Sequence, residues 1–424
     1  MIGKGKLMEN IFSMLTLRGM EYILAFLLVP YLLSVLGPTN YGAIAFMQGV
    51  MAYYNLFIDF GFNLTAPRAV VRAKRDQLST VFSTYLWAKT FLWIVVSVTF
   101  TAILVVVTKA FSYAFDYVLF GVIYLSVLGN ILFPVWFFQG IQQMRYITII
   151  NLLGRFVTIG CIFLVVKSEG DYIWAAFFQS CTPLIAGALS VYFIHREYPG
   201  ILQKPDRKRM MAAIRESKQI FLSNLSVNLY TTSDIILLGL LTNNTIVGYY
   251  SGADKLIGCV KRGVGAINDA VYPYISQRFM ESREGALHFL KKQLYVYIVG
   301  GIFIGFFILI LSPYVIPWLL GERYVSSIMP LQILSFVPLI VAMSNIFGYE
   351  TMLPLGMEKD YSRTLLWASI LNLIMICPLI LLFQENGPAI ATVVTETFVT
   401  AVMGTMLWKK GIWKYINPIN GGTP

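Results

Sequence analysis

The stretch QLYVYIVGGIFIGFFILILSPYVIPWLL, residues 293–320, contains no charged side chain. A helix that crosses the hydrocarbon core of a bilayer needs about 20 predominantly apolar residues, because each residue adds ~1.5 Å to its length. The backbone N–H and C=O groups of such a helix bond within the segment, as a lipid environment requires. Residues 293–320 therefore predict a membrane-spanning helix.

The composition of the whole chain agrees with a membrane protein. Of its 424 residues, 57% are hydrophobic and only 12% are charged, whereas soluble domains carry roughly 25% charged residues. So few charges do not cover a water-exposed surface. The net charge of +11 does not indicate a nucleic-acid partner, because most Lys and Arg residues lie in short links between apolar segments and form no basic domain.

Further apolar windows of spanning length predict an all-α polytopic membrane protein with about twelve transmembrane helices. The first, second, seventh and eighth windows are the most polar, so hydropathy alone supports them least. The twelve windows cover residues 11–36, 42–64, 81–108, 115–138, 147–167, 171–194, 217–241, 246–274, 293–320, 326–353, 363–384 and 387–408.

The distribution of basic residues orients these spans. With a cytoplasmic N-terminus, the outward connections are short and carry few cations, among them Lys109 and Arg323. The inward connections hold clusters of cations, such as the run from Arg196 to Lys218. Because Lys and Arg are enriched in cytoplasmic loops, the pattern predicts a multi-pass protein with both termini in the cytoplasm.

The longest polar stretch, residues 195–218, divides the chain almost in half. It predicts an N-terminal six-helix lobe over 1–200, a cytoplasmic linker over 201–216 and a C-terminal six-helix lobe over 217–424. The linker has two interpretations: an ordinary basic connection, or an interfacial amphipathic helix from Pro205 that anionic headgroups hold. Paired lobes of this kind occur in transporters, whose substrate site lies between the repeats.

Ionisable residues inside the predicted spans are the strongest functional signal. A charge at the centre of a spanning helix costs roughly 2.5–3.5 kcal/mol on insertion scales, so their number predicts a hydrated cavity. The cations would bind a pyrophosphate or acidic sugar, and the acids would serve as counter-ions or as ion-coupling groups. The candidate substrate-binding cations are Arg18, Lys89, Arg155, Lys255, Lys261 and Arg262. The candidate coupling or counter-ion acids are Glu21, Asp59, Asp254, Asp269, Glu350 and Glu396.

Two spans align polar residues on one face. In 246–274 every charged residue falls within an arc of roughly 120°, at 100° per residue. This stripe predicts either a ligand-facing surface or a self-neutralising network that pairs Asp254 with Lys261 and Arg262 with Asp269. In 42–64 there is a smaller stripe, Gln48, Asn55 and Asp59. Such polar side chains suit contact with sugar hydroxyls or packing between helices, and we favour packing.

No catalytic residue, metal site or cofactor is predicted. The four cysteines lie in apolar segments without metal-type spacing, and the two histidines lie in loops far from them. Small buried hydrophobic residues are the simplest interpretation of such cysteines. The residues in question are Cys161, Cys181, Cys259, Cys377, His195 and His288.

Four motifs resemble the Wzx-type O-antigen flippases of the polysaccharide transporter family. They are PYLLSVLGPTNYG at 30–42, DFGFN at 59–63, YTTSDIILLG at 230–239 and VGYYSGADK at 247–255. The resemblance places the chain in the MATE-like MOP superfamily and implies a transporter of two six-helix lobes in a V around a central cavity. In this family the cavity is typically cationic. Peptidoglycan-precursor flippases of the same superfamily usually have fourteen spans, so a count of twelve weighs against that branch.

The resemblance also implies a function and a compartment. It implies a flippase, not an enzyme, that moves an undecaprenyl-diphosphate-linked oligosaccharide from the cytoplasmic to the outer leaflet of the bacterial inner membrane by alternating access through the cationic cavity. The expected partners are this glycan and membrane lipid, with a polysaccharide polymerase and a chain-length regulator as further candidates and no nucleic acid. One alternative is a cation-coupled multidrug or small-molecule exporter of the same fold. Another is a membrane enzyme of glycan assembly, for which the sequence offers no catalytic constellation.

Overall fold

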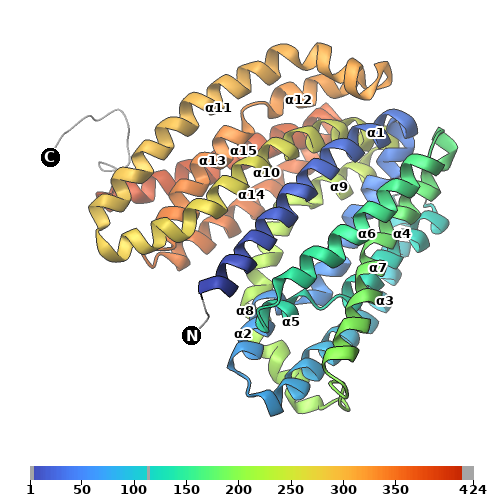
Figure 1. Ribbon diagram of the computed structural model, residues 1–424. Coiled ribbons are helices and arrows are strands. Elements are labelled where there is room, and N and C mark those ends of the chain that lie inside the picture. The colour runs from blue at the N-terminus through green and yellow to red at the C-terminus, as the bar shows by residue number, and fades with distance from the viewer. Residues whose placement is uncertain (1–3, 112–114, 413–424) are drawn as a thin grey trace. The chain divides into compact units, whose positions relative to one another are not determined.

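The computed structural model describes the backbone of residues 4–111 and 115–412 (Figure 1). Within these ranges the side chains of residues 4–18, 21, 22, 25, 269, 270 and 273 are not described. Every regular element in the described ranges is helical, which confirms the all-α prediction. The chain divides into two compact units, Met1–Leu225 and Ser226–Pro424.

The first unit begins with a long helix that breaks at the predicted link between the first two spans. Helix α1 covers Lys4–Asp59, and Gly37 interrupts it with φ 71° and ψ 171°. Glycine adopts this positive φ without the steric cost that a Cβ imposes. Pro38 follows directly, and proline is well suited to the first turn of a new helix.

The remaining elements of the first unit follow the predicted windows, with short extra helices at the ends. A break after Leu132 separates α4 from α5 inside the window 115–138, and α8 begins at Arg207, inside the segment predicted as linker. The elements are α2 (Phe62–Arg72), η1 (Arg75–Gln77), α3 (Leu78–Ala110), α4 (Tyr117–Leu132), α5 (Val135–Gly140), α6 (Met144–Val165), η2 (Glu169–Asp171), α7 (Tyr172–Glu197) and α8 (Arg207–Thr231), whose last residues, from Ser226, belong to the second unit.

Glycine allows an unusually close approach of α4 and α7. A Cβ added at Gly129 of α4 would lie 2.4 Å from the backbone nitrogen of Leu184 in α7. A Cβ added at Gly187 of α7 would lie 3.0 Å from the carbonyl oxygen of Gly129. Small residues let helix backbones meet in this way where lipid supplies no hydrophobic driving force between helices.

Among the described residues, the second unit contains the candidate span with the highest hydropathy, in α11, and a π-helical turn. Helix α11 covers the uncharged stretch 293–320, and large apolar side chains on it, including Phe303 and Trp318, are exposed. The elements are α9 (Ser233–Leu241), α10 (Asn244–Glu281), α11 (Arg283–Leu320), η3 (Glu322–Ser327), α12 (Ile328–Leu334), α13 (Val337–Asn345), the π-helix η4 (Ile346–Met352), α14 (Glu358–Phe383) and α15 (Asn386–Lys409).

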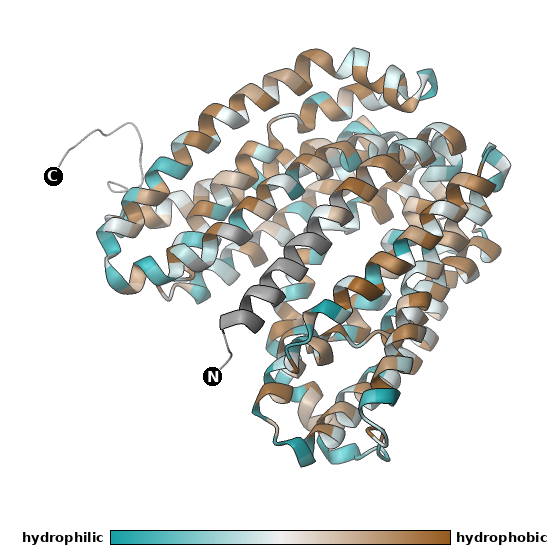
Figure 2. Cartoon of the chain, in the orientation of Figure 1, coloured by the Kyte–Doolittle hydropathy of each residue, from teal (hydrophilic) through white to brown (hydrophobic). Residues whose placement is uncertain are grey.

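The exposed apolar surface identifies a multi-pass membrane protein. Figure 2 shows long hydrophobic stretches along helices such as α3 and α11, with polar residues gathered toward helix ends. Among the described residues, nine helical segments are long and apolar enough to cross a membrane. Helices α8 and α10 are not among them, in line with the polar character of the seventh and eighth windows. The count of twelve spans therefore stays a prediction.

Candidate functional site

The twelve predicted site residues divide between the two units. The side chains of Arg18, Glu21 and Asp269 lie outside the described part of the structure. The first unit contains Asp59, Lys89 and Arg155. The second unit contains Asp254, Lys255, Lys261, Arg262, Glu350 and Glu396.

In the first unit, Arg155 lines a cavity of about 320 Å³ among α1, α4, α6 and α7. Polar side chains from several helices share this lining with Arg155: three carboxamides and two threonine hydroxyls. The lining residues are Leu28, Asn130, Phe133, Asn151, Arg155, Thr158, Ile159, Ile162, Gln179, Thr182 and Pro183.

Interhelical hydrogen bonds orient the polar groups of this cavity. Asn130 Nδ2 of α4 donates to Asn55 Oδ1 of α1 at 3.2 Å. The hydroxyls of Thr158 in α6 and Thr182 in α7 lie 2.7 Å apart. Because the guanidinium group donates, and the carboxamides and hydroxyls both donate and accept, this lining can bind phosphate oxygens together with sugar hydroxyls.

Of the lining residues, sequence analysis identified only Arg155. Asn130, Asn151 and Gln179 each lie on a different helix, although Asn151 lies four residues before Arg155 and therefore on the same face of α6. No spacing within one helix connects them. Their presence inside predicted spans was the available signal, because a carboxamide in lipid is costly unless it is hydrogen-bonded.

Lys89 forms a buried ion pair with Asp59. Lys89 Nζ lies 2.6 Å from Asp59 Oδ1, and the two side chains are 4% and 29% exposed, respectively. The pair connects α3 to the end of α1. The charge of this candidate cation is therefore balanced within the first unit, and Asp59 is its counter-ion in this structure.

The polar stripe on α1 forms contacts with three different helices. Gln48 Nε2 donates to Gln179 Oε1 of α7 at 3.1 Å, Asn55 accepts from Asn130 of α4, and Asp59 pairs with Lys89 of α3. These contacts agree with the packing interpretation of the stripe.

In the second unit, α10 carries a chain of charged residues. Lys261 Nζ lies 4.0 Å from Asp254 Oδ1, and both side chains are about a third exposed, at 32% and 28%. Arg262 is exposed. Its Nη2 lies next to Gly258, 3.8 Å from the position that a Cβ at this glycine would occupy. Lys255 is half-buried. The predicted pairing of Asp254 with Lys261 is present, whereas that of Arg262 with Asp269 falls outside the described side chains.

Acidic residues lie deep in the second unit. Glu350, on the π-helix η4, is fully buried, and its Oε1 accepts a 3.1 Å hydrogen bond from Gln293 Nε2 of α11. Asp234 on α9 is 2% exposed and accepts from Thr392 of α15 at 3.3 Å. Glu396 is half-buried on α15. Asp234 was absent from the predicted site residues, although a carboxylate inside the window 217–241 was a signal for it.

Neither of the two buried carboxylates has an ion-pair partner among the described residues. Burying an anion without a cation is costly, so hydrogen bonds from an amide and a hydroxyl stabilise these groups. In the described part of the chain, no three His, Cys, Asp or Glu side chains gather as a metal site would require.

Comparison with known proteins connects these features to one family of membrane proteins. The model of the family described as polysaccharide biosynthesis protein matches residues 7–279. A candidate O-antigen transporter of Escherichia coli (strain K12) is 29% identical over 406 residues, which cover 94% of this chain and 96% of the relative.

Solved structures share the fold at low sequence identity. The lipid II flippase MurJ in an inward closed conformation superposes with a TM-score of 0.70 and 12% identity, over 96% of this chain and 90% of that one. An outward-facing multidrug resistance MATE transporter of the MOP superfamily gives a TM-score of 0.56 and 16% identity, over 96% and 94% of the two chains. These similarities confirm a MATE-like transporter fold.

Proposed function

Because the chain belongs to the polysaccharide biosynthesis protein family, we propose that it flips an undecaprenyl-diphosphate-linked oligosaccharide from the cytoplasmic to the outer leaflet of the bacterial inner membrane. At a general level it is a flippase of lipid-linked oligosaccharides in that membrane, and a transporter, not an enzyme. The proposal adds the diphosphate carrier, the direction of transport and the residues that bind the glycan.

The cavity around Arg155 is the observation that carries this proposal. A diphosphate does not cross the hydrocarbon core of a bilayer unassisted, because the loss of its hydration there has a very large free-energy cost. A fixed guanidinium group replaces part of that hydration through two parallel hydrogen bonds to phosphate oxygens. The carboxamides of Asn130, Asn151 and Gln179 on the cavity wall would replace water around the sugar hydroxyls.

Alternating access is the mechanism we associate with this cavity. The glycan and diphosphate would move between polar surfaces of the protein, while the polyprenyl chain stays in the bilayer. The cations of α10, Lys255, Lys261 and Arg262, would supply the second set of phosphate contacts. The MATE-like fold and the exposed position of Arg262 support this proposal.

A cation-coupled exporter of the same fold is the alternative, and the acids buried in the second unit favour it. Asp234 and Glu350 provide two carboxyl groups without an ion-pair partner among the described residues. Carboxyl groups of this kind can bind the coupling cation of an ion-coupled transporter. The alternative predicts efflux of cationic dyes from inverted vesicles. The flippase predicts no dye efflux and accumulation of a lipid-linked oligosaccharide when the protein is removed.

Arg155→Ala in a strain that lacks the chromosomal copy tests the proposal. We expect surface polysaccharide to fall at least ~10-fold, because losing hydrogen bonds to a charged phosphate costs about 1.5–3 kcal/mol. The lipid-linked oligosaccharide should accumulate in the inner leaflet. Lys109→Ala, which removes an exposed cation at the end of α3, is the matched control. Wild-type export by Arg155→Ala at normal membrane abundance would refute the assignment of the cavity.

A further inference from the structure

The segment that follows α7 is bound tightly to α3 through one residue, Gln203. Its backbone N–H donates to Ser83 Oγ at 2.7 Å, and its carbonyl accepts from Trp87 Nε1 at 2.8 Å. Its side-chain Nε2 donates to Ser79 Oγ at 2.8 Å, and its Oε1 accepts from Thr80 Oγ1 at 3.0 Å. All four polar groups of Gln203 thus bond to α3, and the segment has a fixed path.

Three residues after Gln203, Asp206 directly precedes helix α8. Its Oδ1 accepts from the backbone N–H of Lys208 at 2.9 Å and of Arg209 at 3.3 Å. Its Oδ2 lies 3.2 Å from Arg209 Nε. Asp206 therefore uses both carboxylate oxygens to cap the helix and to hold one edge of the Arg209 guanidinium group.

The first turns of α8 are amphipathic, which fixes the direction in which its cations point. Ala213 and Ser217 are buried in the first unit, and Met210 packs against the aromatic core around Trp136. Arg209 on α8 is exposed, as is Lys204, which precedes the helix. The helix is thus docked on the protein by its apolar face, and its cations face outward.

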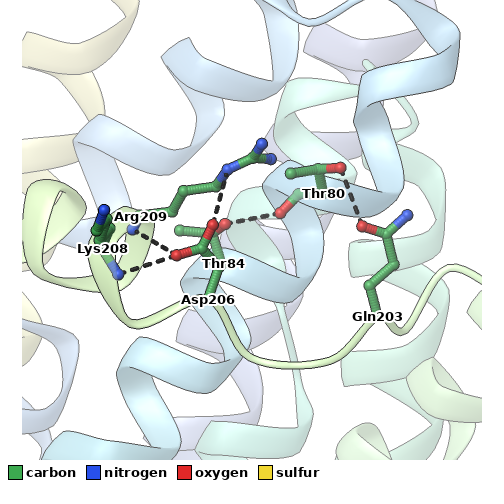
Figure 3. Close-up of polar contacts among 6 residues, drawn as sticks. All are labelled: Thr80, Thr84, Gln203, Asp206, Lys208 and Arg209. Atoms are coloured by element: carbon green, nitrogen blue, oxygen red, sulfur yellow. Dashed lines mark hydrogen bonds and ion pairs between the residues drawn. The ribbon is translucent and has the colours of Figure 1, made fainter.

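A cavity of about 360 Å³ lies between this segment and the start of α3. Figure 3 shows Gln203 and Asp206 on the segment, facing Thr80 and Thr84 of α3. The lining is polar throughout, in contrast to the apolar surface of the spans. It consists of Thr80, Ser83, Thr84, Gln203, Lys204, Asp206 and Arg209.

We propose that this cavity binds a phosphate group, with Lys204 and Arg209 as its cationic ligands. Arg209 contacts Asp206 through Nε, and its two amino groups can donate to phosphate oxygens. Lys204 has no ion-pair partner among the described residues and supplies up to three further donors. With Asp206 counted, the lining carries one net positive charge, which a phosphate diester would neutralise.

An anionic phospholipid headgroup is the source of phosphate that the position favours. The hydrogen bond from Trp87 to Gln203 joins the segment to an indole in the third turn of α3, and indoles of spanning helices concentrate at the level of the headgroups. The adjacent cations Arg207 and Lys208 add long-range attraction to an anionic leaflet. A soluble phosphate ester has the same recognition chemistry, and the experiment separates the two sources.

Lipid binding to the purified full-length protein tests the proposal. Native mass spectrometry would titrate phosphatidylglycerol, with a phosphate-free galactolipid as the reference lipid, and calorimetry would titrate glycerol 3-phosphate. The variant Lys204→Gln/Arg209→Gln removes the two ligands. The control Arg215→Gln/Lys218→Gln removes the same charge from exposed positions of α8 outside the cavity.

We expect the wild type to prefer phosphatidylglycerol over the galactolipid, and the ligand variant to weaken that binding at least ~10-fold. The control should change it less than ~2-fold. If the wild type binds glycerol 3-phosphate and the ligand variant does not, the cavity is still a phosphate site. Its ligand would then be a soluble phosphate ester. Equal losses in both variants would reduce the effect to surface charge and overturn the proposal, as would the absence of any binding that depends on Lys204 and Arg209.

Discussion

Lys89 Nζ of α3 and Asp59 Oδ1 of α1 form an ion pair at 2.6 Å in which the lysine side chain is almost completely buried, at 4% exposure, and the aspartate retains 29%. The asymmetry matters, because an unpaired Asp59 can still reach water or headgroups, whereas an unpaired Lys89 cannot. Removing one partner of a buried pair leaves an uncompensated charge, which costs about 3–5 kcal/mol, whereas replacing both by apolar residues is often neutral.

Substitutions at this pair should therefore be unequal. We expect Asp59→Leu to lower the melting temperature in detergent more than Lys89→Met does, and the double variant Asp59→Leu/Lys89→Met to recover most of the loss. Fluorescence-detected size exclusion after heating measures all three. A double variant that folds but exports no polysaccharide would give Lys89 a role in substrate binding, and one that folds and exports would restrict the pair to structure. Equal destabilisation by the two single variants would contradict the burial argument.

The close approach of α4 and α7 predicts a second pair of variants on one helix. Gly129→Ala would place its Cβ 2.4 Å from backbone atoms of α7, whereas Gly121→Ala, also on α4, would meet nothing within 4 Å. Overpacking of this kind costs about 1–3 kcal/mol, and backbone atoms cannot rotate away as a side chain can. We expect Gly129→Ala to reduce both melting temperature and membrane abundance. Gly121→Ala should leave both unchanged or higher, and similar behaviour of the two variants would count against the described packing.

Local sequence patterns predicted most of the fold. The apolar windows anticipated helices such as α3, α6 and α7 within a few residues, and the link at 37–41 anticipated the break at Gly37. These features depend on hydropathy and on the backbone freedom of glycine, which are properties of neighbouring residues. The start of α8 at Arg207 agrees with one of the two interpretations of the linker, a helix from Pro205. The sequence alone could not choose between them, because the helix depends on Ala213 and Ser217 packing against the first unit.

The candidate site was less predictable because its parts come from separate helices. Arg155 was identified as a cation within a span, but Asn130 and Gln179, which share its cavity, have no sequence relation to it. Lys89 was predicted to bind substrate. The sequence did not reveal its ion pair with Asp59 at 2.6 Å, because this contact follows from the packing of α1 against α3. Periodicity shows which face of a helix a residue occupies, but not which helix that face meets.

The charged stripe on α10 predicts a division of roles between neighbouring residues. Lys261→Gln/Arg262→Gln should reduce polysaccharide export at least ~10-fold without lowering membrane abundance, if these cations contact the diphosphate. Asp254→Asn removes the acid 4.0 Å from Lys261 and keeps both cations, so export should persist. Immunoblots of surface polysaccharide and of the protein provide the measurements. If Asp254→Asn impaired export and thermal stability as strongly as the double variant, the stripe would be a structural network.

The carboxyl group of Glu350 is fully buried on the π-helix η4 and accepts a hydrogen bond from Gln293. Glu350→Ala leaves the buried Gln293 amide without this acceptor, and an unsatisfied buried polar group costs about 1–3 kcal/mol. Glu350→Gln keeps a carbonyl oxygen at nearly the same place, so we expect it to match the wild type in melting temperature while Glu350→Ala melts lower. Glu322→Ala, at an exposed acid of η3, controls for loss of negative charge. Because π-helical turns concentrate at functional sites, export adds a second readout. A stable Glu350→Gln protein that exports no polysaccharide would assign the carboxyl group to ion coupling. A Glu350→Gln protein as unstable as Glu350→Ala would show that the hydrogen bond to Gln293 does not stabilise this position.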